Sequence, residues 1–226
     1  MSEQEFSVRQ YEKKYQTGYG LVYPESHIIR LHKQILDWEL GLRSGNVFDF
    51  GCGSGAHLKY FSEQGFAPFG CDTSQTAIKR CKKILPRWSK NFFVTPVKPD
   101  LTKFLRPCSL DVFLSNQVFY YLSDAEIRNV TNQAHMLLRP GGVFIATMMS
   151  HTCWYTRYIV GAKDGFKRIE MGTPRQKETM FINFKSEKSL PALFKPFQKL
   201  HLGSYGSHIR EEEGSTDHWI YVGNKR

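Results

Sequence analysis

The chain has 226 residues, which is enough for one domain with a substantial hydrophobic core. Hydrophobic residues make up 41% and aromatic residues 14%, which excludes a disordered chain, and no apolar run reaches the roughly 20 residues that a membrane-spanning helix needs. An excess of 31 Lys and Arg residues over 21 Asp and Glu residues gives a net charge of +10, which favours anionic partners.

Residues 1–44 are predicted to form an amino-terminal helical segment that precedes the main fold. Four tyrosines recur at every fourth position, which is a helical period: Tyr11, Tyr15, Tyr19 and Tyr23. Gly18 and Gly20 favour a loop at the end of this series. A second helix is expected from Pro24 to about Leu40, because Pro is favoured at a helix start and apolar residues follow at helical spacing.

From residue 45 onward, short apolar runs alternate with amphipathic segments, a pattern typical of a parallel sheet with crossover helices. Strands are expected at residues 47–50, 67–71, 92–95, 110–114 and 143–148. Helices are expected at residues 56–64, 74–85 and 123–138. Residues 150–185 break the rhythm with glycines, scattered charges and aromatic residues, and are predicted to be an insertion that shapes an acceptor site or a lid. A last helix at 186–197 and two strands, 199–204 and 219–222, complete the chain.

The most informative stretch follows the first expected strand: Asp49-Phe50-Gly51-Cys52-Gly53-Ser54-Gly55. Glycine at alternate positions lets the backbone take positive φ and approach a ligand, and the helix that follows points its free N–H groups into the turn. The spacing Gly51-x-Gly53-x-x-Ala56, with Asp72 about 20 residues on, also satisfies a loose dinucleotide pattern. A carboxylate at Asp49 would repel a pyrophosphate, so the stretch favours a cofactor that carries positive charge.

Two further motifs follow in order, Gly70-Cys71-Asp72 and Leu138-Arg139-Pro140-Gly141-Gly142. With the glycine turn, they make residues 45–150 resemble the class I S-adenosylmethionine-dependent methyltransferases. The resemblance implies an α/β, Rossmann-like fold with a seven-stranded, mostly parallel sheet in the order 3-2-1-4-5-7-6. Strand 7 would be antiparallel, and helices would cover both faces. We expect one methyltransferase domain over residues 1–226.

The resemblance implies S-adenosyl-L-methionine as cofactor and S-adenosyl-L-homocysteine as product. It assigns these residues to the cofactor site: Asp49, Gly51, Gly53, Gly55, Asp72, Asp100, Leu101 and Asn116. Asp72 would accept hydrogen bonds from the ribose hydroxyls, a task that suits two acceptor oxygens. Asp100 and Leu101 would hold the adenine, although an aspartate there would also serve as a helix N-cap. Tyr15 and Tyr19 are expected to close over the cofactor, and residues 1–23 to become ordered when it binds.

The acceptor end of the site is less clearly marked. Tyr120 and His151 are the catalytic candidates, and His151, directly after the fifth strand, would act as a base toward a hydroxyl acceptor. His208 and Arg210 are further substrate candidates, Arg210 as a clamp for a phosphate or carboxylate, or else as a partner of Glu211–Glu213. No metal site is expected. Ser115–Tyr120 departs from the Asn/Asp-Pro-Pro-Tyr/Phe motif of nucleic-acid amino methyltransferases, which disfavours such a substrate.

The leading functional hypothesis is a methyltransferase that acts on O or N of a small or medium-sized metabolite, and an anionic acceptor is left open. The charge of +10 keeps an RNA methyltransferase as the alternative, and a catalytically silent, cofactor-binding partner subunit is a third. The five cysteines form an odd set without C-x-x-C spacing, and the amino terminus is polar. We therefore expect reduced thiols and a cytoplasmic location. The sequence does not determine the oligomeric state.

Overall fold

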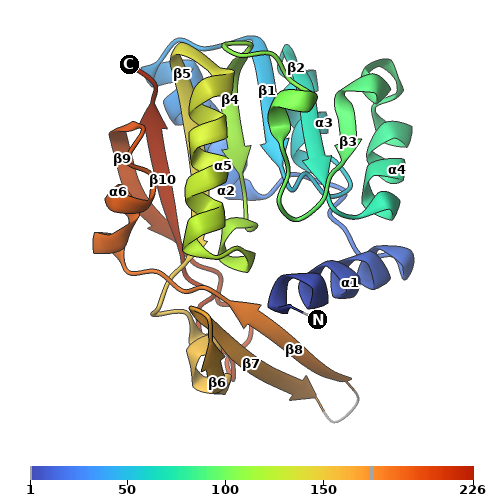
Figure 1. The fold of residues 1–226 in the computed structure, drawn as a ribbon, viewed down its shortest axis with the longest axis vertical. Helices are drawn as coiled ribbons and strands as arrows, with labels where there is room; N and C mark the ends of the chain where they lie inside the picture. The colour runs from blue at the N-terminus through green and yellow to red at the C-terminus, as the bar shows by residue number, and fades with distance from the viewer. Residues whose placement is uncertain (1, 174–175) are drawn as a thin grey trace.

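A seven-stranded, mostly parallel sheet forms the centre of the computed structural model, which describes residues 2–173 and 176–226 (Figure 1). Its strands are β1 (Gly45–Phe50), β2 (Phe66–Asp72), β3 (Phe92–Val94), β4 (Leu110–Ser115), β5 (Leu138–Met149), β9 (Gln198–Tyr205) and β10 (His218–Asn224). They lie in the order β3-β2-β1-β4-β5-β10-β9, and β10 is antiparallel to both of its neighbours. The predicted fold class and strand order are confirmed.

Helices cover both faces of this sheet. The α-helices are α1 (Glu3–Gln16), α2 (Ser26–Arg30), α3 (Ala56–Glu63), α4 (Gln75–Ile84), α5 (Asp124–Leu137) and α6 (Leu190–Leu193). A π-helical segment, η1 (Leu31–Glu39), continues α2, so the helix expected from 24 to 40 is present. Short 3₁₀ segments are η2 (Pro86–Asn91), η3 (Leu101–Lys103), η4 (Phe119–Tyr121), η5 (Trp154–Tyr158) and η6 (Glu187–Ser189). No helix among the described residues has the length and apolarity to cross a bilayer.

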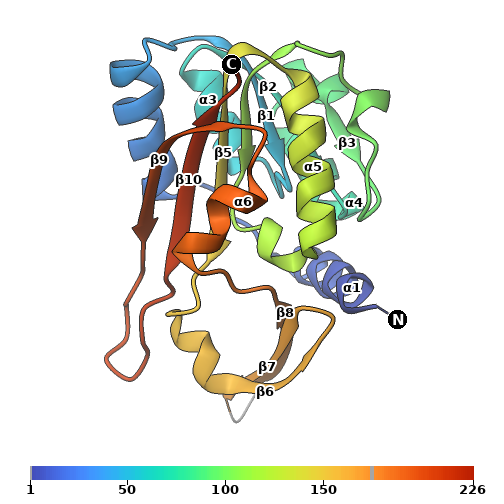
Figure 2. The same ribbon diagram turned by 60° about the vertical axis from the view of Figure 1, so that its left-hand side comes forward.

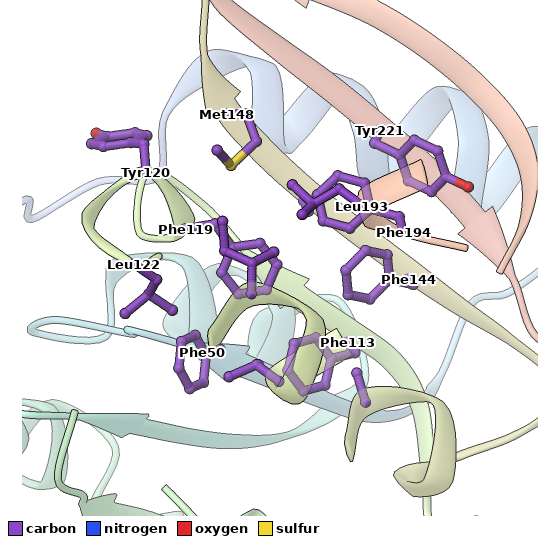
Figure 3. Packing of buried hydrophobic residues seen from close by; sticks show 14 of the residues in the cluster. Phe50, Phe113, Phe119, Tyr120, Leu122, Phe144, Met148, Leu193, Phe194 and Tyr221 are labelled. Atoms are coloured by element: carbon purple, nitrogen blue, oxygen red, sulfur yellow. The ribbon is translucent and has the colours of Figure 1, made fainter. Parts of the chain in front are cut away.

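Each buried strand sends successive side chains to two different cores, because side chains alternate across a sheet. On β4, Val112 joins the cluster that contains residues of η1, α3 and α4, whereas Phe113 joins the cluster beneath α5 and α6. The second cluster is mainly aromatic, and Figure 3 shows Phe113, Phe144 and Phe194 close together within it. Near-continuous apolar runs therefore identify the central strands, since both faces of the sheet are buried.

The carboxyl ends of the parallel strands face two elements that lie outside the sheet. Helix α1 crosses below these ends, and next to it lies a three-stranded antiparallel sheet of β6 (Ile159–Lys163), β7 (Phe166–Thr173) and β8 (Gln176–Ile182) (Figures 1 and 2). Most of the 150–185 insertion thus has a regular structure that its scattered pattern did not predict. Open α/β sheets bind ligands at this edge, so both elements are placed to wall a site.

The helix expected at 186–197 is much shorter in the structure. The α-helical part is Leu190–Leu193, preceded by η6. Pro191 stands at its start, where proline is tolerated. Pro196 disfavours helical backbone at the residue before it, and the chain leaves the helix ahead of this proline.

Candidate active site

The glycine turn links the end of β1 to the start of α3. Gly51, Gly53 and Gly55 have φ values of 81°, 53° and 87°, a left-handed region that other residues rarely adopt. A Cβ atom at Gly53 would lie 2.5 Å from the hydroxyl oxygen of Tyr15, so the turn also allows close approach of α1. The N–H groups of Gly51 and Cys52 donate to the Cys71 carbonyl at 2.8 and 2.9 Å, which holds the turn against β2.

Asp49 lies behind the turn and is only 1% exposed. Its Oδ2 atom has no hydrogen-bond partner among the residues that the structure describes. His57, in the first turn of α3, places Nδ1 3.6 Å from this oxygen and Nε2 3.7 Å from Oε2 of Glu25. Burial alone would lower the pKa of His57, but hydrogen bonding and attraction to Asp49 and Glu25 outweigh it and raise the pKa to about 9.

Glu25 is held by the residues that follow β4. Nδ2 of Asn116 and Nε2 of Gln117 donate to its two carboxylate oxygens at 2.6 and 2.8 Å. Gln117 has a φ of 58°, an unusual value for a residue with a side chain, and its backbone N–H donates to Oγ1 of Thr147 at 2.7 Å. The strained residue is thus fixed by β5 on one side and by Glu25 on the other.

Asp72 ends β2 and lies beside the glycine turn. Its Oδ2 accepts from the Gly53 N–H at 2.9 Å and its Oδ1 accepts from the Ser74 N–H at 2.8 Å. Burial is the main cause that raises the pKa of this carboxyl. The two oxygens keep further lone pairs, so Asp72 combines a structural task in the turn with the capacity to accept from a ligand.

A cavity of about 200 Å³ separates these groups from α1. A water molecule needs about 10–15 Å³ by this measure, so the space is that of a small-molecule site and not of a packing defect. The glycine turn, Asp72 and Thr95–Val97 form one wall, and five tyrosines line other parts of the cavity: Tyr11, Tyr15, Tyr19, Tyr120 and Tyr121. Figure 3 shows Tyr120 at the margin of the aromatic core.

Helix α1 closes the cavity and is attached at several points. Oε2 and Oε1 of Glu12 accept from the hydroxyls of Ser74 and Thr76 at 2.6 and 2.5 Å, at the amino-terminal end of α4. The hydroxyls of Tyr11 and Tyr121 lie 2.6 Å apart. The Lys14 ammonium pairs with Glu178 on β8. The helix is therefore held by both the main sheet and the small sheet.

Several predicted site residues line this cavity. They are Gly51, Gly53, Asp72, Asn116, Tyr15, Tyr19 and Tyr120, while Asp49 lies directly behind it. Gly55 supports the turn from within, since a Cβ there would meet Cys81 at 2.6 Å. Their roles toward a cofactor stay predictions.

Other predicted residues lie outside the cavity lining. Asp100 is exposed, and its Oδ1 accepts from the Thr102 N–H at 3.2 Å as the N-cap of η3, while Leu101 is buried in the aromatic core. His151 is exposed, with Nδ1 3.3 Å from the Lys185 carbonyl oxygen. His208 and Arg210 lie in the exposed β9–β10 loop, where Arg210 pairs with Glu213 at 3.2 Å.

Sequence reasoning missed Glu25 and His57 as site residues. A signal existed for His57, which stands two residues after the last glycine of the turn. None existed for Glu25, because a glutamate after a proline at a helix start has an ordinary explanation in the helix dipole. Thr95–Val97 was also missed, although it directly follows β3 at the ligand-binding edge. Among the described residues, no group of three or more His, Cys, Asp or Glu side chains is arranged to hold a metal ion.

The strand order and the position of the cavity define a Rossmann-like fold with a ligand site at its topological switch point. Comparison with known proteins supports this class. Residues 48–144 match the family described as "Methyltransferase domain". Proteins named "Uncharacterized methyltransferase" from Bacillus cereus and Bacillus anthracis are 28% identical over 141 residues, which is 61% of this chain and 64% of theirs. The alignment thus covers less than two thirds of these relatives.

Solved structures show the same fold at low sequence identity. The 1,6-didemethyltoxoflavin-N1-methyltransferase of Burkholderia thailandensis, with S-adenosylhomocysteine bound, is 18% identical with a TM-score of 0.64, and the match covers 100% of this chain and 91% of that one. The N-methyltransferase NodS of Bradyrhizobium japonicum, also with S-adenosylhomocysteine, is 15% identical with a TM-score of 0.62 over 99% of each chain. Residues 48–144 thus match a methyltransferase domain, and the predicted resemblance to class I S-adenosylmethionine-dependent methyltransferases is confirmed.

Proposed function

We propose that the protein transfers a methyl group from S-adenosyl-L-methionine to O or N of a small or medium-sized metabolite. One observation carries the proposal. The buried Oδ2 of Asp49 has no hydrogen-bond partner among the described residues, although the His57 imidazole lies 3.6 Å away, and it lies behind a glycine turn whose backbone forms the wall of a cavity. His57 offsets only one of the two carboxylates that flank it, Asp49 and Glu25, so the site keeps a negative charge that a cationic ligand would stabilise.

The residues around the cavity offer the types of chemical group that such a cofactor needs. Asp72 offers acceptor lone pairs for ribose hydroxyls, and Thr95–Val97 offers backbone groups and an apolar surface for a base. The tyrosines present faces that attract a cation. When bound, the cofactor supplies a methyl group made electrophilic by its positively charged sulfur.

The chain itself would contribute alignment and the exclusion of water. Helix α1 covers the cavity, and its attachment through Glu12 and Tyr11 keeps the lid in place. Tyr120, buried in η4 after β4, would position an acceptor by its hydroxyl and ring. Holding two reactants in line is the main task in such a transfer, and it contributes several kcal/mol of a barrier.

Calorimetry with S-adenosylhomocysteine and NAD tests the cofactor assignment. We expect binding of S-adenosylhomocysteine and none of NAD, because the carboxylate of Asp49 disfavours a pyrophosphate at the turn. Binding of NAD with no affinity for S-adenosylhomocysteine would refute the assignment. His57→Gln and Asp72→Ala should both weaken S-adenosylhomocysteine binding if the cavity is the binding site.

Methyl transfer itself is tested with a labelled methyl donor and cell extract, with and without RNase. We expect label in low-molecular-weight material that RNase does not change. Label that disappears with RNase would support an RNA substrate instead, for which no specific feature of the cavity argues. Label in any acceptor would exclude a catalytically silent subunit. The cytoplasmic location stays a prediction.

A further inference from the structure

The cavity wall is acidic and aromatic, although the chain as a whole is basic. Among the residues that the structure describes, no lysine or arginine lines the cavity, and its ionised groups are Glu25, Asp72 and His57. Asp49 adds a further carboxylate directly behind His57. Three carboxylates against one imidazolium leave a negative site.

The basic excess lies elsewhere. On α4 and η2 the exposed cations are Lys79, Lys82, Lys83, Arg87 and Lys90. The cations that contact the tyrosines of the lid are engaged: Lys14 pairs with Glu178, and Arg80 donates to the Tyr19 carbonyl at 2.8 Å. Arg210, the predicted phosphate clamp, pairs with Glu213 outside the cavity. A phosphate or carboxylate on the acceptor would therefore meet carboxylates and no free cation.

The described residues of the cavity wall also include no free base. Glu25 accepts from two side-chain amides, and Asp72 accepts from two backbone amides. His57 lies between two carboxylates, which favours its protonated form. Burial raises the pKa of Tyr11, Tyr120 and Tyr121, so their phenols stay protonated and act as donors. A hydroxyl acceptor needs a base to attack, whereas an amine with a lone pair does not.

We infer, on the basis of the proposed function, that the acceptor is an amine or nitrogen heterocycle without acidic groups. Its nitrogen lone pair forms the new N–C bond while the C–S bond breaks, and the electron pair of that bond goes to sulfur. The positive charge passes from sulfur to nitrogen, inside a negative site that stabilises it. A proton on the methylated nitrogen, where there is one, leaves to water. Tyrosine faces in the wall suit a flat acceptor and the cation that it becomes on methylation.

Fractionated metabolites test this inference while the identity of the acceptor is still open. Small molecules from cell extract are separated by ion exchange into basic, neutral and acidic fractions. Each fraction is then incubated with the protein and a donor that carries a ¹³C-labelled methyl group. We expect transfer with the basic or neutral fraction, and a ¹³C chemical shift typical of N-methyl in the product. Transfer confined to the acidic fraction, or an O-methyl product, would overturn the inference and leave the proposed function intact.

A charge placed in the cavity wall provides a second test. Tyr19→Arg adds a cation to the lining, and Tyr23→Arg adds the same charge four residues away in the same loop, outside the lining. At limiting acceptor, we expect Tyr19→Arg to lower transfer to the active fraction about tenfold, because the added cation opposes the positive charge that passes to the acceptor nitrogen. Tyr23→Arg should change it less than twofold. Equal effects of the two variants, or faster transfer in Tyr19→Arg, would contradict the inference.

His218 is the strongest candidate for a general base near the site, and a general base would contradict the inference. It is buried, its Nδ1 lies 2.8 Å from the Thr216 carbonyl, and its Nε2 has no partner among the described residues, but it does not line the cavity. If it served as a base toward a hydroxyl, His218→Gln would abolish transfer and an O-methyl product would be found in the parent protein. We expect an N-methyl product and transfer retained within about threefold in His218→Gln. Calorimetry with S-adenosylhomocysteine shows whether the cofactor site is intact. If the protein bound S-adenosylhomocysteine but transferred no methyl group to any fraction, both proposals would be overturned.

Discussion

The carboxylate of Asp72 holds the glycine turn in place and also lines the cavity. It accepts from the Gly53 and Ser74 amides and still faces the cavity. We expect Asp72→Ala to weaken S-adenosylhomocysteine binding by about 1–3 kcal/mol, as for the loss of hydrogen bonds to a charged group. Calorimetry would measure this, with Asp164→Ala, an exposed site in the β6–β7 turn, as the control. Unchanged affinity in Asp72→Ala would place the ribose elsewhere.

His57 links stability to pH. Its pKa is raised from 6.5 to about 9 in the folded protein, so its stabilising effect is complete below pH 6.5 and is lost as the pH rises through about 9. The loss is on the order of 3 kcal/mol for a shift of this size. Urea unfolding at a series of pH values would show the decline in the parent protein and in His151→Gln. The inference about His57 would be wrong if His57→Gln showed the same decline.

Single residues also show where local pattern was insufficient. Asp49, Asp72 and the glycines lie around the turn, since their positions follow from strand ends and one loop, while their roles toward a cofactor stay predictions. Asp100 lies only a few residues from Thr95–Val97, yet it points to solvent as an N-cap. The sequence signal of an N-cap and that of a ligand contact are the same, so only the packing of the loop distinguishes them.

At the scale of elements, α1 is held mainly by polar contacts spread along its length, among them Glu3 with Lys163 and Gln4 with Glu126 near its start. Tyr15 is its buried residue, and Glu12 joins it to α4. Few buried apolar contacts make local opening easy. The predicted ordering of residues 1–23 on cofactor binding is consistent with this arrangement and stays a prediction.

We expect Glu12→Ala to speed tryptic cleavage at Arg9, Lys13 or Lys14 about tenfold, because loss of its hydrogen bonds removes roughly 1–2 kcal/mol that opposes local opening. Saturating S-adenosylhomocysteine should slow cleavage in both proteins. Glu63→Ala, at an exposed position of α3, serves as the control. If Glu12→Ala and Glu63→Ala were cleaved at the same rate, Glu12 would not be an anchor of the lid.

The strands of the small sheet, β6–β8, could not be predicted from the sequence pattern. Its strands have one face against the core, where Ile169 and Ile182 are fully buried, and the other toward solvent or α1. Such half-buried strands have fewer apolar residues than the central strands, and glycines interrupt them. The sequence therefore indicated an insertion but not its strands.

For the molecule as a whole, the small sheet and the main sheet share one core. Ile169 and Ile182 belong to the same cluster as Phe113 and Phe144, and this is the basis for expecting one cooperative unit. With Trp38, Trp88 and Trp219 replaced by Phe, the remaining Trp154 reports on η5 beside the small sheet. We expect its fluorescence and the far-UV circular dichroism to show coincident urea transitions. An earlier transition of Trp154 would divide the chain into two units and refute the single-domain prediction.

The amino-acid sequence by itself predicted the central strands and the ligand turn, because these follow from local signals: apolar runs and a glycine-spaced turn. The strand order and the cofactor followed from the family resemblance that these motifs carry. Only the tertiary structure decided how the acceptor end is built. Glu25, His57, Gln117 and the tyrosines of α1 come from distant parts of the chain, and the cavity is acidic although the net charge is +10. Net charge sums over the whole surface, whereas a ligand meets only the few side chains that folding brings to one cavity.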